Sequence, residues 1–275
     1  MGIRYAEVIG DPVAHSKSPL THKHWLRPLE IEGDYLRTGV EATDLKAFLE
    51  GRRSDPDWRG CNVTVPHKEA VLSLLDELDE SAAKVGAANC IVSRNGRLTG
   101  FNTDVDGIAA ALDATELGGR EAILIGAGGA ARAAVSYLSD RKVAGITVLA
   151  RDPQKADPLR ELARRGTFQM LGLADDRAPA DPSAIINASP LGMLGSPEMP
   201  DSLLAGVAAR ASGATVFDMV YNPLETAFLS RGREAGATVV DGLTMLLGQA
   251  ERAFELFFGR PSPPTDQRLR DLLIT

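Results

Sequence analysis

The sequence predicts an α/β protein in which a doubly wound parallel sheet follows an N-terminal α/β region. After residue 120, short apolar runs recur and helical patterns fill most of the gaps between them, for example at 130–139 and 155–165. The runs are nearly continuous in apolar residues, as in parallel strands covered on both faces. This alternation of strand and helix indicates a doubly wound domain. The six expected strands are 121–125, 145–149, 167–171, 184–187, 215–220 and 238–240.

The first hundred residues also alternate apolar runs with helical stretches, but they include a hairpin. The dipeptide Asn95-Gly96 predicts the turn of a hairpin over 88–101. Ser18-Pro19 predicts a helix with Ser18 as its N-cap. The tail predicts an amphipathic helix over 243–258 and a short final helix after Pro264. Other expected strands are 5–10, 34–40 and 61–65. Other expected helices are 67–75 and 103–113.

The composition and the charge of the chain exclude several classes of function. The chain has 275 residues and a net charge of −7, without a long basic run, which argues against nucleic acid or an anionic membrane as the main partner. Its two cysteines, Cys61 and Cys90, form no disulfide framework and predict a cytoplasmic setting. No apolar run is long enough to span a membrane, and the N-terminus lacks the layout of a signal peptide. The histidine and cysteine spacings predict no metal site.

A glycine-rich segment, G-x-G-x-x-A, lies between the first expected strand and helix of the second region. It begins at Gly126 and ends at Ala131. The first glycine permits a tight turn, the second lets the backbone approach a pyrophosphate, and the alanine allows close packing of helix on strand. This pattern predicts a Rossmann-type dinucleotide-binding domain, although a glycine turn without a ligand is the alternative. The predicted cofactor-contacting residues are Gly126, Ala127, Gly128, Gly129 and Ala130.

The end of the second strand carries the information on the choice of dinucleotide. Proteins that bind NAD usually place an acidic residue there for the ribose, and this chain has Ala150. Arg151 and Lys155 follow and could hold a 2′-phosphate, so NADP is predicted. Asp152 leaves two alternatives open, because it could bind a bare ribose or cap the following helix.

Six further segments are dense in polar residues at expected loop positions. With the glycine segment, they resemble the shikimate dehydrogenase family over essentially the whole chain. The resemblance implies a reversible, NADPH-dependent reduction of 3-dehydroshikimate to shikimate. One departure concerns the cofactor, since the family usually has Asn-Arg-Thr where this chain has Ala150-Arg151-Asp152. The segments are 10–19, 62–68, 86–89, 100–104, 218–223 and 241–249.

The resemblance also implies roles for individual residues. Lys68 and Asp104 match the catalytic pair, with the lysine transferring a proton and the aspartate orienting it. Ser16 and Ser18 match the serines that bind the substrate carboxylate. The remaining matches are Thr64, Asn89 and Gln249 for the ring hydroxyls, Tyr221 for the same cleft, and Gly242 and Met245 near the nicotinamide. His67, beside Lys68, is expected to fix its loop by hydrogen bonding.

These observations predict three parts of the chain and leave several hypotheses about its function open. We expect a substrate-binding domain over 1–103, an NADP-binding domain over 104–240, and C-terminal helices over 241–275 that return to the first domain. The chain would act as a monomer or a homodimer on a small molecule. A quinate or aminoshikimate dehydrogenase, possibly NAD-dependent, is the closest alternative. A dinucleotide sensor is another class, but it would not need Lys68, Asp104 and a hydroxyl-rich site.

Overall fold

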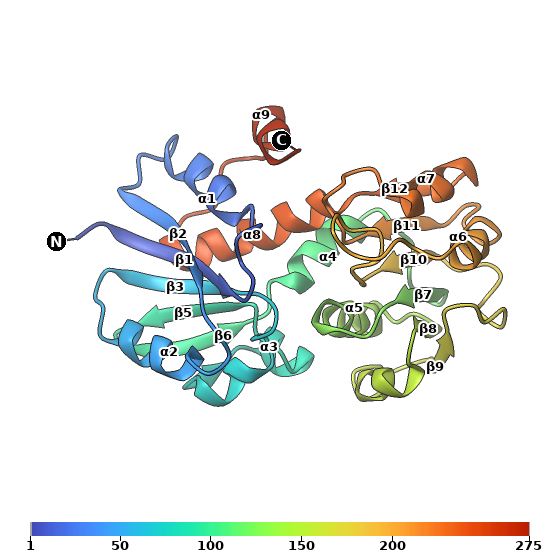
Figure 1. Cartoon of the computed structure of the whole chain (residues 1–275), viewed down its shortest axis with the longest axis horizontal. Helices are drawn as coiled ribbons and strands as arrows, with labels where there is room; N and C mark the ends of the chain where they lie inside the picture. The colour runs from blue at the N-terminus through green and yellow to red at the C-terminus, as the bar shows by residue number, and fades with distance from the viewer. Residues whose placement is uncertain (1, 275) are drawn as a thin grey trace. The chain divides into compact units, whose positions relative to one another are not determined.

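The chain folds into two compact units in a computed structural model that describes residues 2–274, apart from the side chain of Lys155 (Figure 1). The first unit contains the residues up to Asp104 and those from Gln249 onward, and the second unit contains Val105–Gly248. Residues 241–248 therefore lie with the second unit. The functions assigned to segments 1–103, 104–240 and 241–275 stay a prediction.

A six-stranded mixed sheet forms the centre of the first unit, in the order β2-β1-β3-β5-β6-β4. Strand β1 is parallel to both of its neighbours, whereas β5 and β6 form an antiparallel hairpin. Asn95 and Gly96 at the hairpin turn have φ angles of +53° and +78°, as a type I′ turn requires. The predicted hairpin is confirmed. The strands are β1 (Arg4–Gly10), β2 (Gly33–Gly39), β3 (Trp58–Val63), β4 (Glu77–Leu78), β5 (Cys90–Arg94) and β6 (Arg97–Phe101).

Both faces of this sheet are covered. One face packs Ile9, Trp58 and Val63 against Leu45 and Leu49 of helix α2. The other face packs Val8 and Tyr35 against Ala253 and Phe257 of helix α8. An apolar layer thus covers each face of the sheet, and polar loop residues can reach only the ends of its strands. The helices of this unit are α1 (Ser18–Leu26), α2 (Leu45–Arg53), the 3₁₀ helix η1 (Ala70–Leu74), α3 (Glu80–Val85), α9 (Gln267–Ile274) and the part of α8 (Gly242–Phe258) from Gln249.

The second unit contains six parallel strands in the order β12-β11-β10-β7-β8-β9. The chain order runs outward in both directions from β7, so β7 borders the switch point where such sheets bind ligands. The predicted doubly wound sheet is confirmed, and the bounds of β7, β10 and β12 match the prediction to the residue. The strands are β7 (Glu121–Ile125), β8 (Gly145–Ala150), β9 (Thr167–Gly172), β10 (Ala184–Asn187), β11 (Thr215–Asp218) and β12 (Thr238–Val240).

Helices and one 3₁₀ segment connect the parallel strands. Thr226 caps helix α7, because its hydroxyl accepts from the Leu229 N–H at 3.3 Å. Helix α8 begins after Asp241, whose carboxylate accepts from the Thr244 N–H at 3.0 Å. The helices are α4 (Asp104–Leu112), α5 (Gly129–Asp140), the 3₁₀ helix η2 (Pro153–Leu159), α6 (Asp201–Ala208), α7 (Ala227–Glu234) and the first turns of α8.

Three local predictions are wrong. The α-helix expected over 155–165 is the shorter 3₁₀ helix η2, which contains Pro158, a residue without the N–H that a longer helix needs. The helix expected over 67–75 is η1, closed by a bond from the Leu72 N–H to the carbonyl oxygen of Glu69, three residues back. Ser18 is not an N-cap: the helix starts at Ser18 without a side-chain cap, and its hydroxyl bonds to Ser16 instead.

Two features are absent from the described residues. Within residues 2–274, no group of three His, Cys, Asp or Glu side chains is arranged to hold a metal ion. Over the same residues, no helix has the length and apolar character needed to cross a membrane.

Candidate active site

A lysine–aspartate pair lies in the first unit, where Lys68 follows strand β3 and Asp104 begins helix α4. Lys68 Nζ donates to Asp104 Oδ2 at 2.6 Å. Their side chains are 18% and 8% exposed, so water reaches the lysine more than the carboxylate. A carboxylate withdrawn from water needs a cation or several donors beside it. The pair therefore holds two opposite charges in contact and leaves the amine partly open to solvent.

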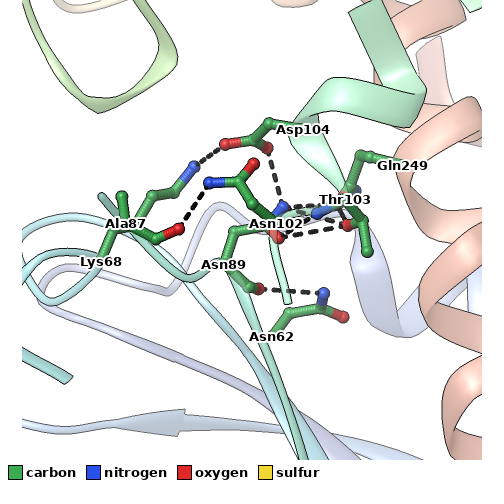
Figure 2. Close-up of polar contacts among 8 residues, drawn as sticks. All are labelled: Asn62, Lys68, Ala87, Asn89, Asn102, Thr103, Asp104 and Gln249. Atoms are coloured by element: carbon green, nitrogen blue, oxygen red, sulfur yellow. Dashed lines mark hydrogen bonds and ion pairs between the residues drawn. The ribbon is translucent and has the colours of Figure 1, made fainter. Parts of the chain in front are cut away.

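Asn89, in the loop before β5, holds the other oxygen of Asp104 (Figure 2). Its Nδ2 donates to Asp104 Oδ1 at 2.8 Å and lies 3.1 Å from Thr103 Oγ1. Its Oδ1 accepts from the Thr103 N–H at 2.7 Å. Both ends of one amide thus bind the residues at the start of α4. This clamp fixes the carboxylate of Asp104 while its second oxygen faces the lysine.

Gln249 of helix α8 completes this cluster. Its Oε1 lies 3.5 Å from Asn89 Nδ2 and 3.4 Å from Thr103 Oγ1 (Figure 2). The structure therefore brings together four of the predicted residues, Lys68, Asn89, Asp104 and Gln249. Thr103, which the sequence analysis did not place in the site, is a fifth member. An amine, a carboxylate and two amides side by side form a set of donors and acceptors suited to a polyhydroxylated ring.

The two predicted serines form a second group. Ser16 Oγ lies 3.2 Å from Ser18 Oγ, and the Ser18 N–H donates to Ser16 Oγ at 3.3 Å. Arg37 of β2 donates from Nη2 to the backbone oxygen of Ser16 at 2.5 Å. Ser18 is buried and Ser16 is partly exposed. Two adjacent hydroxyls, with a guanidinium holding their loop, can donate to an anion such as a carboxylate.

A buried hydrogen-bonded chain that the sequence analysis missed connects the serines to Asn89. The Tyr35 hydroxyl donates to Asn62 Oδ1 at 2.5 Å and is also hydrogen-bonded to the Ser18 side chain. Asn62 Nδ2 donates to the backbone oxygen of Asn89 at 3.3 Å. Burial raises the pKa of the Tyr35 phenol well above its usual value, so the phenol stays neutral and keeps its proton. Asn62 begins one of the polar motifs, but a single tyrosine in an expected strand gave no signal.

Thr64 and His67 lie in the loop that leads from β3 to Lys68. Thr64 is partly buried, and its N–H donates to the Ile9 carbonyl at 2.9 Å. A Cβ at Gly10 would come within 2.4 Å of Thr64 Cγ2, so only glycine fits beside it. His67 Nε2 contacts the Val40 carbonyl oxygen at 2.6 Å, which confirms the expected loop-fixing bond. Hydrogen bonds to Ile9 and Val40 therefore hold the loop that carries Lys68 in place.

The glycine segment of the second unit has the geometry of a phosphate-binding turn. Gly126 has a φ of +108°, and a Cβ there would lie 3.0 Å from the Ala188 carbonyl group. At Gly128, by contrast, a Cβ would meet nothing within 4 Å, and helix α5 starts at the next residue. Ala131 is fully buried against the sheet. The start of α5 is thus open where an anion could approach its N–H groups, which fits a dinucleotide.

The residues after β8 carry the predicted phosphate contacts. Arg151 is exposed directly after the strand. Asp152 caps the 3₁₀ helix η2, because its carboxylate accepts from the Gln154 N–H at 3.2 Å. The capping alternative for Asp152 is confirmed. The side chain of Lys155 lies outside the part of the chain that the structure describes.

Three other predicted residues lie in the second unit after strands β11 and β12. Tyr221 is partly buried in the loop after β11, and Met245 is buried on α8. Gly242 is the first residue of α8, where a Cβ would lie 2.5 Å from the Val220 carbonyl oxygen. No side chain fits at Gly242, so glycine is required for this helix start.

A doubly wound unit with an open glycine turn, together with a unit that carries a lysine–aspartate pair, defines a dinucleotide-binding α/β protein of the dehydrogenase class. Two family models match the chain, a shikimate dehydrogenase substrate-binding domain over residues 8–91 and a shikimate 5′-dehydrogenase C-terminal domain over residues 242–266. A shikimate dehydrogenase (NADP(+)) from Sphingopyxis alaskensis is 45% identical over 98% of this chain and 97% of its own length. The chain belongs to the shikimate dehydrogenase family.

Solved structures agree with this assignment and include more than one activity. Shikimate 5-dehydrogenase from Thermus thermophilus, in complex with NADP(H) and shikimate, has a TM-score of 0.83 at 33% identity and is covered over 98% of both chains. Quinate dehydrogenase from Corynebacterium glutamicum, in complex with NAD, has a TM-score of 0.85 at 28% identity, over 98% of this chain and 97% of that one. The fold alone therefore does not separate the two substrates.

Proposed function

We propose that the chain catalyses the reversible, NADPH-dependent reduction of 3-dehydroshikimate to shikimate. The observation that carries this proposal is the contact of 2.6 Å between Lys68 and Asp104, held by Asn89 in a chain of this family. A protein that only senses the dinucleotide would not need a partly exposed amine that is hydrogen-bonded to a buried carboxylate. The cluster instead supports chemistry on a hydroxyl or ketone group.

Lys68 is proposed to move the proton. Reduction of a ketone generates negative charge on its oxygen, and a proton must reach that oxygen as the charge forms. The Lys68 ammonium, which is partly exposed beside the carboxylate, is placed to donate it, and the neutral amine would take it back in the oxidation direction. Asp104 is proposed to orient the amine and to accept a bond from a ring hydroxyl. NADPH supplies the hydride.

The remaining predicted residues are proposed to hold the substrate. Ser16 and Ser18 would donate their hydroxyls to the carboxylate, and Arg37 adds positive charge beside their loop. Thr64, Asn89 and Gln249 would bind ring hydroxyls, since Thr64 and Asn89 offer polar side chains in loops at strand ends and Gln249 offers one from within α8, beside Asn89. Tyr221 is proposed for the substrate as well, on the family resemblance alone.

The dinucleotide is proposed to bind on the second unit. The open turn at Gly126–Ala130 supports binding of the pyrophosphate, and the exposed Arg151 supports binding of a 2′-phosphate. Ala150 stands where proteins that bind NAD usually place an acidic residue, which supports NADP over NAD, and Asp152 caps the 3₁₀ helix η2 through Oδ1. Lys155 is proposed as a second phosphate contact, and Gly242 and Met245 as neighbours of the nicotinamide.

We also propose a cytoplasmic enzyme with small-molecule partners, either a monomer or a homodimer. Cys61 and Cys90 are buried thiols on neighbouring strands. Their register pairs Cys61 with Ile91 and Asn62 with Cys90, so the two thiols point to opposite faces of the sheet. That arrangement suits a reducing compartment, because no disulfide is needed or possible between them.

The test is a set of four assays that follow the absorbance of the reduced nicotinamide. Shikimate and quinate are each oxidised with NADP and with NAD, and kcat/KM is measured for each pair. We expect shikimate with NADP to be best, with shikimate preferred over quinate by at least about tenfold, or about 1.4 kcal/mol. Comparable values for quinate would favour a quinate dehydrogenase, and better values with NAD would contradict the cofactor. Dinucleotide binding without turnover of either substrate would indicate a sensor.

A further inference from the structure

A buried polar network lies at the carboxyl ends of strands β10 and β11 and has no role in the function proposed above. Asp218, the last residue of β11, is fully buried, and its carboxylate accepts three hydrogen bonds. Oδ1 accepts from Asn187 Nδ2 at 2.9 Å and from the Val220 N–H at 3.0 Å. Oδ2 accepts from the Thr226 hydroxyl at 2.6 Å. All of these donors are neutral.

The network fixes the two loops that leave these strands. The bond from Asp218 to the Val220 N–H folds the loop after β11 back on its own strand. Asn187 does the same for the loop after β10, because its Oδ1 accepts from the Ser189 N–H and hydroxyl at 3.1 and 2.7 Å. Its Nδ2 also donates to the Leu191 carbonyl at 3.1 Å. Asp218 therefore orients Asn187, and the two side chains together set both loops.

Two glycines of the candidate dinucleotide site pack directly on these loops. A Cβ at Gly126 would lie 3.0 Å from both the carbonyl group of Ala188 and Cβ of Ser189. A Cβ at Gly242 would lie 2.5 and 2.6 Å from the carbonyl oxygens of Val220 and Met219. A methyl group would overlap backbone atoms at Gly242 and would be tightly confined at Gly126, whose φ of +108° also favours glycine. A small shift of the loops would therefore displace the phosphate turn and the start of α8.

We infer that Asp218 is a positioning residue for the dinucleotide: it holds the loops after β10 and β11 in the place that the Gly126 turn and the Gly242 helix start require. The inference rests on the proposed function only for the identity of the ligand, NADP. Asp218 does not touch the ligand in this proposal. It acts through Asn187, Ser189 and Val220.

The chemistry of the network explains why an acceptor is needed at position 218. Three donors converge on the two oxygens of Asp218, and the two that hold the loops, Asn187 Nδ2 and the Val220 N–H, share Oδ1. Alanine offers no acceptor, so both of these donors would be left unsatisfied in a buried place. Asp218→Ala therefore releases both loops at once.

The test measures NADP binding to the full chain by calorimetry without shikimate. We expect Asp218→Ala to weaken NADP binding by at least about tenfold and to raise the KM for NADP by a similar factor. Thr226→Val removes the donor at Oδ2 but leaves the bonds to both loops, and we expect its NADP affinity to stay within about threefold of wild type. Leu204→Ala, a cavity in the core of the same unit, controls for loss of stability alone.

The outcomes separate positioning from stability. Weaker NADP binding in Asp218→Ala, with normal binding in an equally destabilised Leu204→Ala, supports the inference. Unchanged NADP affinity in a destabilised Asp218→Ala overturns it. If Asp218→Ala does not fold, Asn187→Ala decides, because it removes the amide between Asp218 and the loop after β10, and affinity equal to wild type then overturns the inference. A wild-type chain that binds NADP but leaves shikimate unchanged contradicts the proposed function alone, whereas a chain that binds no dinucleotide contradicts both.

Discussion

Asp104 in the first unit and Asp218 in the second are both buried carboxylates, but different kinds of group stabilise them. Asp104 lies 2.6 Å from the Lys68 ammonium and accepts from one amide. Asp218 has no cation among its hydrogen-bond donors and accepts from an amide, a hydroxyl and a backbone N–H. The first arrangement pairs a buried carboxylate with a partly exposed amine. The second fixes backbone loops and is closed to solvent.

The difference has an electrostatic consequence for Asp218. Burial raises its pKa from 3.8 to about 6, although the three hydrogen bonds act in the opposite direction. The folded chain therefore holds this proton more tightly than the unfolded chain does. Ionisation of Asp218 lowers the stability of the fold as the pH rises from about 4 to above 6. A buried carboxylate held only by neutral donors thus lowers the stability of the fold when it ionises.

The largest effect is expected when the charged pair of the first unit is broken. Lys68→Ala should lower turnover by about 10²–10⁴-fold, the usual range for a general acid–base. Shikimate affinity should change much less, because the carboxylate contacts proposed for Ser16 and Ser18 do not involve the lysine. Turnover at saturation and shikimate binding by calorimetry measure the two effects separately.

Lys84→Ala is the matched control for Lys68→Ala. Lys84 lies in the same unit and also pairs with a carboxylate, Glu80, at 2.9 Å, but as a surface pair on helix α3. Surface pairs of this kind contribute little to stability, so we expect wild-type turnover. If Lys68→Ala keeps turnover within threefold of wild type, Lys68 only binds substrate and another group carries the proton.

The second prediction tests the closed carboxylate of the second unit. The unfolding free energy of the wild type should lose about 2 kcal/mol between pH 4 and pH 7 through Asp218, since its pKa is near 6 when folded and 3.8 when unfolded. Asp218→Asn cannot ionise, so this decrease should be absent from the variant. Urea unfolding of both proteins across this pH range gives the difference in slope.

The comparison of slopes is independent of any hydrogen bond that the asparagine changes, because such a change shifts the unfolding free energy at every pH. Asp175→Asn is the control: Asp175 is in the same unit but pairs with Arg177 at the surface, which lowers its pKa to about 2. Its removal should leave the slope above pH 4 unchanged. Parallel curves for wild type and Asp218→Asn would show that Asp218 is not protonated in this range.

The third prediction concerns the exposed cation of the second unit. Arg151→Ala should raise the KM for NADP by about 10–100-fold, because charge-assisted hydrogen bonds contribute about 1.5–3 kcal/mol. The KM for NAD, which lacks the 2′-phosphate, should scarcely change. Steady-state kinetics with each dinucleotide test this. Arg231→Ala, an exposed arginine paired with Glu234 on α7, should leave both values unchanged. Equal losses with NAD would mean that Arg151 binds another part of the dinucleotide.

Local patterns in the sequence predicted much of the fold and part of the candidate site. Strand β7 and the turn at Asn95-Gly96 were predictable because neighbouring residues determine them. The polar motifs contained Lys68, Asn89 and Asp104, and the structure places them in contact. The hydrogen-bonded series Ser18–Tyr35–Asn62 was not predictable. Tyr35 and Asn62 are 27 positions apart in the sequence and lie on different strands, so no local pattern indicates their contact. Asp218 lay in a noted motif, but no sequence pattern shows that a polar residue is fully buried.

His22 gives the smallest expected effect and the one opposite in sign to Asp218. Its ring is fully buried in the first unit, stacks on Tyr35 at 4.0 Å between ring centres, and neither ring nitrogen has a hydrogen-bond partner among the described residues. Burial lowers its pKa from 6.5 to about 3. The folded chain therefore excludes a proton that the unfolded chain binds, and stability is lost as the pH falls below 6.5.

Replacing the imidazole by another ring isolates this effect. His22→Phe keeps the aromatic stack but cannot be protonated, so it should remove a loss of about 1.4 kcal/mol in unfolding free energy between pH 7.5 and pH 5.5. His24→Gln is the control on the same helix, because His24 is partly exposed and lies 3.4 Å from the Asp266 carboxylate. Its removal takes away the contact with Asp266 and should leave the loss of stability in acid as large as in the wild type. If His22→Phe and wild type lose stability equally over this range, the His22 ring reaches a proton acceptor or water when folded, and the contrast in sign with Asp218 disappears.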